Sequence, residues 1–258
     1  MELPKVAVIT TTYNGLPLLR EAVASVLAQT AVSLHYVVVD DGSTDGTAAY
    51  LQTIQDSRLT LLQPGRIGRA RALNLAVEAS QAPFIANLDA DDKMLPGRLA
   101  QQARFLQENP TVGLVGTAVR WETENGQQTI RTFLADDSSL RQRLFTGYPF
   151  VHSAVMYRRS ALQQAGAFDP SLPCALDYDI ACRLAVHAQL ANLAEPLVVR
   201  RVHGKNFFMQ QISTGQYVRA LWHIKWRYWA ASGRPLHLLP RLMATTISSG
   251  VYKWRSHR

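Results

Sequence analysis

The chain has 258 residues, 47% of them hydrophobic, which suits one sizeable folded core and excludes a disordered or fibrous protein. Its net charge of +8 is uneven: residues 196–258 hold 11 Lys or Arg and no Asp or Glu, so the first 195 residues carry 16 basic against 19 acidic side chains. The basicity belongs to the tail, so we expect no nucleic-acid partner. We also expect no signal peptide, because the apolar start at 6–9 is too short and leads into polar residues. No membrane-spanning helix is expected either, because no uncharged apolar run reaches about 18 residues.

The first 90 residues alternate between strand-like and helix-like patterns. Short apolar runs predict buried strands at 6–9, 35–39, 59–62 and 84–88. Apolar stripes with helical spacing predict helices at about 19–29, 48–54 and 70–79. This alternation indicates right-handed βαβ units and a parallel sheet with helices on both faces.

Each of these strands ends in a polar cluster. The clusters lie at 11–14, 40–43, 65–71 and 89–92. Because ligands of such sheets bind beyond the carboxyl ends of the strands, we expect all four clusters to line one crevice.

The last cluster places three carboxylates, Asp89, Asp91 and Asp92, within four residues. Like charges side by side are costly unless a cation or hydrogen-bond donors neutralise them, so a positive partner is expected there. An acidic N-cap of the helix that starts near Pro96 is the alternative.

The pattern changes after residue 106. The runs 112–121 and 128–133 flank Asn125-Gly126 and predict a β-hairpin. Further strands are predicted at 150–157 and 197–199, with helices at 160–165 and 177–187. We expect a catalytic domain over residues 1–205, in halves of about 1–110 and 111–205, and a helical extension over 206–258.

Seven motifs occur in the order seen in family 2 of the glycosyltransferases, the inverting enzymes of the GT-A fold. They are Thr11-Thr12-Tyr13-Asn14, Asp40-Asp41-Gly42-Ser43-Thr44-Asp45, Gly68-Arg69-Ala70-Arg71-Ala72-Leu73-Asn74, Asp89-Ala90-Asp91-Asp92, Gly166-Ala167-Phe168-Asp169, Asp177-Tyr178-Asp179 and Arg201-Val202-His203. The chain resembles this family over roughly residues 5–205. The resemblance implies a Rossmann-like α/β/α sandwich that binds a nucleotide-diphosphosugar, with a mainly parallel central sheet and here a helical tail. It also implies inverting transfer of a sugar, from a UDP-sugar by preference, to a saccharide or lipid-linked acceptor in cell-surface polysaccharide or glycolipid synthesis.

The resemblance also implies a metal site. Asp91, Asp89 and His203 would hold Mn²⁺ or Mg²⁺, hard cations that suit carboxylates and diphosphate oxygens. Asp92 would stand behind these ligands or cap a helix.

The nucleotide would be bound by residues from several loops. By resemblance these are Thr11, Tyr13, Asn14, Asp40, Gly68, Arg71 and Asp89. An Asx turn is the alternative role for Asp41 and Ser43, and a solvated position on a helix is the alternative for Arg71.

Inverting transfer needs a base that takes the acceptor proton, and the resemblance assigns this role to Asp177. Leu176 stands where the family usually has a second acid. Asp177 and Asp179 could instead be acids at a helix N-terminus. Asp179, Asp92 and His152 are weaker candidates for contacts with the donor or acceptor.

The tail predicts an amphipathic helix over 215–229. Tyr217, Leu221, Ile224 and Tyr228 form its apolar stripe, beside Trp222, Trp226 and Trp229. Basic helices with tryptophan are typical of membrane surfaces, so we expect a cytoplasmic protein that is peripheral on the inner face of the membrane. Packing against the sheet, a homodimer interface and an anionic polymer are the alternatives.

Two other functions are considered. A sugar nucleotidyltransferase needs a glycine-rich, lysine-bearing loop after the first strand, which residues 10–15 lack. A non-catalytic module that binds nucleotide sugar or membrane stays open.

Overall fold

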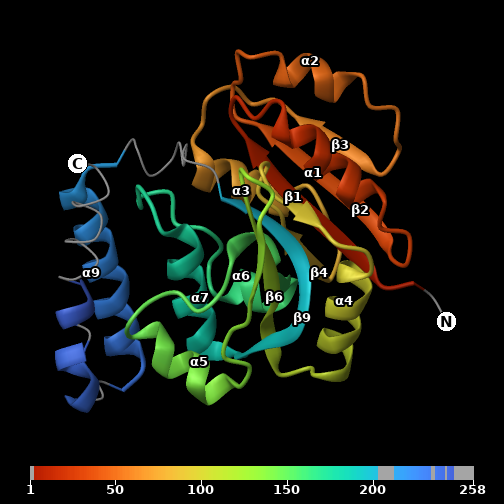
Figure 1. Ribbon diagram of the computed structural model, residues 1–258. Coiled ribbons are helices and arrows are strands. Elements are labelled where there is room, and N and C mark those ends of the chain that lie inside the picture. Colours follow the sequence, from red (N-terminus) through yellow and green to blue (C-terminus); the bar gives the residue numbers. More distant parts are fainter. Residues whose placement is uncertain (1–2, 203–211, 234–235, 242, 247–258) are drawn as a thin grey trace.

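A computed structural model describes residues 3–202, 212–233, 236–241 and 243–246. Figure 1 shows helices on both faces of a curled sheet. In the described part this sheet has nine strands, in the order β3-β2-β1-β4-β8-β6-β9-β5, with β7 paired to β6. The predicted α/β class is confirmed.

The strands are β1 (Lys5–Thr12), β2 (Ser33–Asp40), β3 (Leu59–Leu62), β4 (Phe84–Asn87), β5 (Lys93–Met94), β6 (Val112–Thr123), β7 (Gln128–Arg131), β8 (Met156–Arg158) and β9 (Gln189–Val202). The helices are α1 (Leu18–Leu27), α2 (Thr47–Gln52), α3 (Arg69–Glu78), α4 (Arg98–Glu108), α5 (Asp137–Leu144), α6 (Arg159–Gln164), α7 (Leu176–His187) and α9 (Thr214–Ala231). Two 3₁₀ turns complete the set, η1 (His152–Ala154) and η2 (Leu236–Leu238).

The first half of the sheet is parallel, as predicted. β1 lies between β2 and β4, and the register opposes Thr12 to Asp40 and Ile9 to Asn87. The carboxyl ends of these strands therefore meet at one edge of the sheet, which is where the predicted polar clusters lie.

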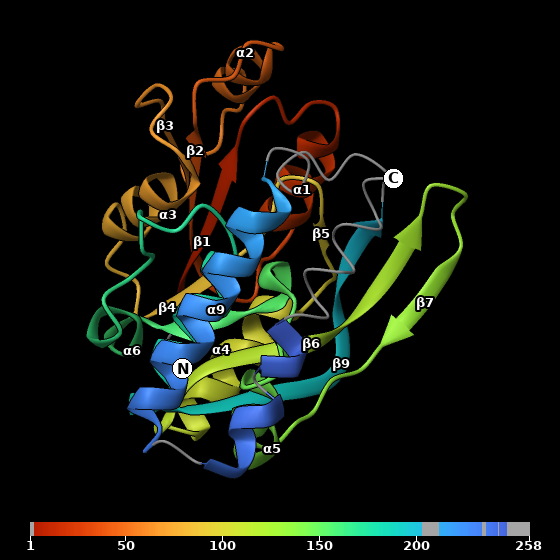
Figure 2. The same cartoon turned by 90° about the vertical axis from the view of Figure 1, so that its left-hand side faces the viewer.

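The second half mixes directions. β8 joins the halves by antiparallel pairing with both β4 and β6, and the long strands β6 and β9 run parallel. β6 and β7 form the predicted hairpin, which projects from the body in Figure 2.

Alternate residues of each central strand feed two cores. On β1, Val6 and Val8 pack on the face covered by α1 and α4, whereas Ala7 and Ile9 pack on the face covered by α3, α6 and α7. This period-two alternation of apolar side chains requires helices on both faces.

The predicted strand over 150–157 is largely wrong. Residues 152–154 form η1, and only 156–158 pair in the sheet as β8. The side chain of His152 contacts Arg69 of α3 and Asn87 of β4, and the Ser153 hydroxyl accepts from the backbone N–H of Asp89. These polar contacts outweigh the apolar character of the segment. The short elements α5 and β5 were not predicted.

The tail helix α9 packs its predicted stripe against the body. Leu221, Ile224 and Tyr228 are buried in the same core as α7, so the stripe packs against a helix of the body, whereas the alternative considered was packing of the tail against the sheet. Trp222 and Trp226 stay 40% and 43% exposed. Among the described residues, no helix combines the length and the apolarity needed to cross a membrane.

Candidate active site

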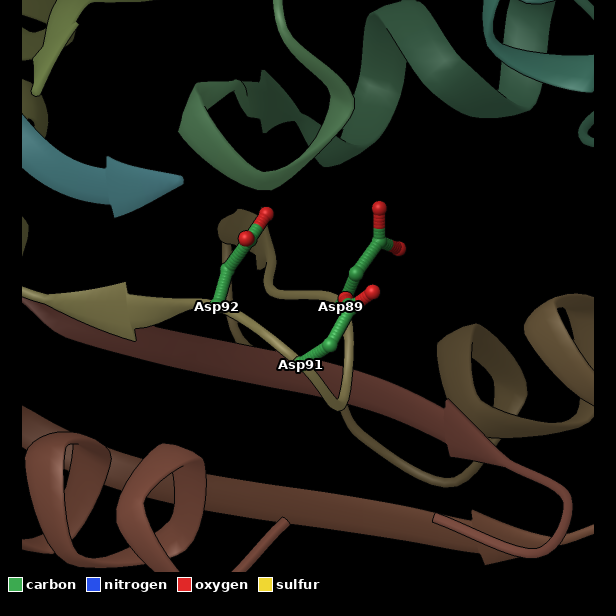
Figure 3. A group of neighbouring side chains, drawn as sticks. All are labelled: Asp89, Asp91 and Asp92. Carbon is green, nitrogen blue, oxygen red and sulfur yellow. The ribbon is translucent and has the colours of Figure 1, made fainter. Parts of the chain in front are cut away.

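The acidic loop after β4 gathers its three carboxylates in one place. Asp89, Asp91 and Asp92 each offer an oxygen, and these oxygens all lie within 4.8 Å of one another. Figure 3 shows the three side chains leaving the loop toward the same side. The predicted cluster is therefore a real cluster in space, with the geometry of a possible cation site.

Asp89 is held as a carboxylate by its neighbours. Its Oδ1 lies 2.6 Å from Arg69 Nη2, 3.3 Å from Asn87 Nδ2 and 3.4 Å from His152 Nδ1. Burial alone would raise the pKa of Asp89, but the charge of Arg69 and the contacts of His152 and Asn87 hold it well below its usual range. Asp89 is therefore ionised at neutral pH.

Asp92 is the opposite case. It is 3% exposed, accepts a hydrogen bond from Arg201 N at 2.9 Å and contacts the Ser153 hydroxyl. Burial, followed by the negative charges of Asp91 and Asp89, raises the pKa of Asp92 to about 8. Without a cation, Asp92 keeps its proton at neutral pH.

This raised pKa predicts a pH dependence of stability. From about pH 4 to about pH 8 the unfolded chain has released the Asp92 proton while the folded chain retains it, so the free energy of unfolding falls as pH rises across this window. Asp92→Asn cannot ionise and keeps both hydrogen bonds. We expect it to exceed the parent in stability at pH 8.5 by on the order of 2–4 kcal/mol, and by much less at pH 5. Thermal unfolding in EDTA measures this; an equal difference at both pH values would contradict the assignment.

Arg69 connects the cluster to α7. The negative charge of Asp89 is the main cause that raises the pKa of the Arg69 guanidinium, and burial acts against it. The charges of Asp177 and Asp91 raise this pKa further. Arg69 belongs to one of the seven motifs, but no role was predicted for it from the sequence. Arg69 is the first residue of α3 and directly follows Gly68, and this position next to a predicted ligand loop could have indicated a role in the site.

His152 and Asn87 complete this polar group. His152 is 7% exposed, and its Nδ1 lies 3.2 Å from both Arg69 Nη2 and Asn87 Nδ2. The same Nδ1 lies 3.4 Å from Asp89 Oδ1, so one ring nitrogen of His152 is shared by Arg69, Asn87 and Asp89. His152 therefore sits inside the site, where the sequence suggested it only weakly.

Asp177 lies in the first turn of α7, where its Oδ1 accepts from Tyr178 N at 2.9 Å. The negative charge of Asp177 raises the pKa of Arg69. Burial raises the pKa of the Tyr157 hydroxyl, and the charges of Asp177 and Asp89 raise it further. The fold thus brings Asp177 into the electrostatic range of the acidic cluster, although about 90 residues separate them in the chain.

A buried arginine of α4 donates hydrogen bonds to backbone carbonyls next to the site. Arg98 is 0% exposed, and its Nη2 donates to the carbonyls of Asn87 at 3.0 Å and Val155 at 3.1 Å. Its Nε donates to Gln102, whose amide reaches the carbonyls of Val115 and Ala154. Burial lowers the pKa of Arg98 to about 9, against the charges of Asp92 and Asp89. This pair, also missed from sequence, ties β4 to the segment that carries η1.

The loops after β1 and β2 are fastened to each other. Asn14, at φ 52°, accepts from Thr44 N at 2.7 Å, and its own N–H donates to the Ser43 hydroxyl at 2.9 Å. Asp40 is 3% exposed and accepts from Ser43 N at 3.0 Å. Thr11 is the last residue but one of β1, the strand that lies between β2 and β4.

Asp41 is fully occupied by the loop before α3. Its Oδ1 accepts from Ile67 N at 2.7 Å and Gly68 N at 3.0 Å, and its Oδ2 pairs with Arg66 at 2.6 Å. The Arg66 guanidinium in turn lies 3.7 Å from the centre of the Tyr13 ring. Asp41 therefore has a structural role, which leaves Asp40 as the better candidate for ligand contact.

Three sequence candidates fare differently. Asp179 is 1% exposed and paired with Arg183 at 2.6 Å, so we assign it to the packing of α7 and no longer to ligand contact. Arg71 is exposed on the first turn of α3. His203 lies outside the described residues.

Comparisons with known proteins agree with this geometry. The sequence model described as glycosyl transferase family 2 matches residues 7–166. An uncharacterized glycosyltransferase of Methanocaldococcus jannaschii is 26% identical over 82% of this chain and 76% of its own. The chondroitin synthase of Pasteurella multocida is 25% identical over 82% of this chain, which spans only 22% of that protein.

Two solved structures share the fold. TarS residues 1–349 of S. aureus, in complex with UDP-GlcNAc, superpose with a TM-score of 0.71 at 20% identity, covering 85% of this chain and 65% of that one. The mannosyltransferase PcManGT of Pyrobaculum calidifontis, in complex with GDP-Man and Mn²⁺, gives 0.67 at 23% identity, covering 99% and 73%.

Proposed function

Because this chain belongs to glycosyltransferase family 2, whose sequence model matches residues 7–166, we propose that it transfers a sugar from a nucleotide-diphosphosugar to an acceptor hydroxyl with inversion. The family and the GT-A fold are established, and relatives include polysaccharide synthases. The donor, the stereochemistry, the metal and the acceptor are the proposed part.

The observation that carries the proposal is the cluster of three acids at the edge where the nucleotide loops converge. Asp91 and Asp89 would hold Mn²⁺ or Mg²⁺, since hard cations favour carboxylate ligands and share the rest of their coordination with phosphate oxygens. Asp92, which is buried behind them, would adjust the charge of the site. When bound, the cation would neutralise charge that develops on the departing diphosphate.

The protein's own residues account for the remaining steps. Asp177, across Arg69 from the cluster, would take the proton of the acceptor hydroxyl. Attack from the side of α7, opposite a diphosphate held at the acidic loop, gives inversion at the anomeric carbon. His152, Arg69 and Asn87 would keep Asp89 ionised and oriented.

The nucleotide would lie across the loops after β1 and β2. Tyr13 would pack against the base, Asp40 would accept from a base N–H or ribose hydroxyl, and Thr11 and Gly68 would line the pocket. Arg71 is exposed near the start of α3 and would reach a phosphate. A UDP-sugar is the favoured donor, with the Asp40 carboxylate accepting from the imide N–H of uracil.

Nucleotide binding provides the direct test. We expect UDP with Mn²⁺ to raise the melting temperature of the parent by several degrees, and either component alone to raise it less, because a ligand that binds only the folded state stabilises it. Asp91→Asn should abolish the additional shift from Mn²⁺.

The matched control is Glu78→Gln, an exposed acid at the end of α3, which should respond like the parent. No shift with UDP or GDP at any Mn²⁺ concentration would reject the donor class. Binding without turnover of any nucleotide sugar would favour a non-catalytic module.

The tail is the proposed link to a lipid-linked acceptor. Trp222 and Trp226 are exposed side by side on α9, with ring centroids 5.9 Å apart, in a segment without acids. Exposed tryptophan among basic residues favours an anionic membrane surface on the cytoplasmic side. Sedimentation with vesicles of an anionic and of a zwitterionic phospholipid tests this; equal recovery with both would argue against it.

A further inference from the structure

Two arginines converge on one tryptophan beside the active site. Trp121 of β6 lies between β7 and β9, and the guanidinium carbons of Arg131 and Arg200 lie 4.8 and 5.1 Å from its ring centre. The register explains this arrangement, since Trp121 is opposite Arg200 on β9 while Arg131 on β7 is opposite Val119, two residues away on the same face.

Neither arginine has a carboxylate partner among the described residues. The other face of the same strands is different: Lys93 lies 3.3 Å from Glu21 and 3.8 Å from Glu122, and Arg201 also pairs with Glu21. Lys93 and Arg201 on that face are therefore paired with acids. The residues from 196 onward contain no Asp or Glu, so no side chain of the tail can neutralise Arg131 and Arg200.

The pair of arginines is adjacent to the proposed site of transfer. Trp121 packs on the cluster that includes Val151 and Ala154, the residues on either side of His152 and Ser153. The residue after Arg200 donates its backbone N–H to Asp92 at 2.9 Å. The pair therefore lies next to the acidic loop through β9 and to the η1 segment through Val151 and Ala154.

We propose that Trp121, Arg131 and Arg200 form an anion-binding subsite for the acceptor, which is a saccharide chain carrying carboxylate or phosphate groups. The indole ring orders two guanidiniums at a low entropic cost, and their N–H groups are left to donate to an anion. A charged group held at Arg200 would lie one residue along β9 from the backbone N–H that Asp92 accepts, which places the rest of the saccharide beside the acidic cluster. This inference rests on the proposed function, which it extends to the class of the acceptor.

Calorimetric titration tests the subsite without any donor. The probes are a hexasaccharide that alternates glucuronate with N-acetylhexosamine, a glycerol phosphate oligomer of equal charge, and neutral chitohexaose. We expect the parent to bind at least one anionic probe at least tenfold more tightly than chitohexaose, and the tighter of the two identifies the charged group. Arg131→Gln and Arg200→Gln should each weaken that binding about 10- to 100-fold, as expected for a lost charge-assisted hydrogen bond.

The matched control is Arg104→Gln, which removes an exposed arginine paired with Glu108 on α4 and should bind like the parent. Melting temperatures confirm that the variants are folded. Chitohexaose binding as tightly as both anionic probes, or variants that bind within twofold of the parent, would overturn the inference. Anion binding by a parent that turns over no donor would reject the proposed reaction but retain the subsite.

Discussion

Asp177→Asn should lower kcat for transfer by about 10²- to 10⁴-fold while the affinity for UDP and Mn²⁺ stays within about twofold of the parent. The range is that of a lost general base, since the amide cannot accept the acceptor proton. Affinity should persist because Asp177 belongs to α7 and not to the loops that follow β1 and β2, and its effect on the site is the action of its charge on Arg69. Steady-state transfer assays with saturating donor, together with calorimetry of UDP binding, measure both quantities.

Two variants make this result specific. Asp177→Glu keeps a carboxylate but moves it by one methylene, so it should recover part of the rate. Glu195→Gln changes an exposed acid on β9 and should leave the rate unchanged. An unchanged rate in Asp177→Asn would remove this residue as the base, and a loss confined to donor affinity would make it a binding residue instead.

Sequence reasoning located the edge of the sheet that carries the site because this edge follows from local patterns alone. Apolar runs that end in Tyr13-Asn14, Asp40-Asp41 and Asp89-Asp92 define parallel strands, and parallel strands bring their carboxyl ends together. The sequence already favoured Asp40 over Asp41 for ligand contact, and the fold supplies the physical reason, since Asp41 is occupied by Ile67, Gly68 and Arg66.

The partners of the acids could not be predicted in the same way. Arg69 and Ser153 reach Asp89 and Asp92 from segments 20 and 61 residues away in sequence. Their contacts depend on where α3 begins and on the 3₁₀ turn η1, which interrupts an apolar run that otherwise suits a strand. At η1 the strand propensity of the apolar run is overridden, because the buried polar side chains there need hydrogen-bond partners.

Arg98 was missed although the sequence contains a signal. The buried stripe of α4 consists of Arg98, Leu99, Gln102, Ala103 and Leu106, so two polar residues occupy positions that helical spacing assigns to the core. Polar residues on a buried face need partners, and the spacing of four between Arg98 and Gln102 already suggests that they bind each other. The carbonyls that they satisfy could not be identified without the fold.

Arg98→Met should therefore be strongly destabilising, by on the order of 3–5 kcal/mol, because it leaves the carbonyl of Asn87 and the amide oxygen of Gln102 buried without their donor. Arg98→Lys, which keeps a charge and donors but not the fork geometry, should lose less. Urea unfolding at pH 7 measures both, with Arg104→Gln on the exposed face of the same helix as a control that should stay within about 0.5 kcal/mol of the parent. Since replacing a buried charge by an apolar side chain is stabilising in some proteins, a methionine variant as stable as the parent would show that these carbonyls do not depend on Arg98.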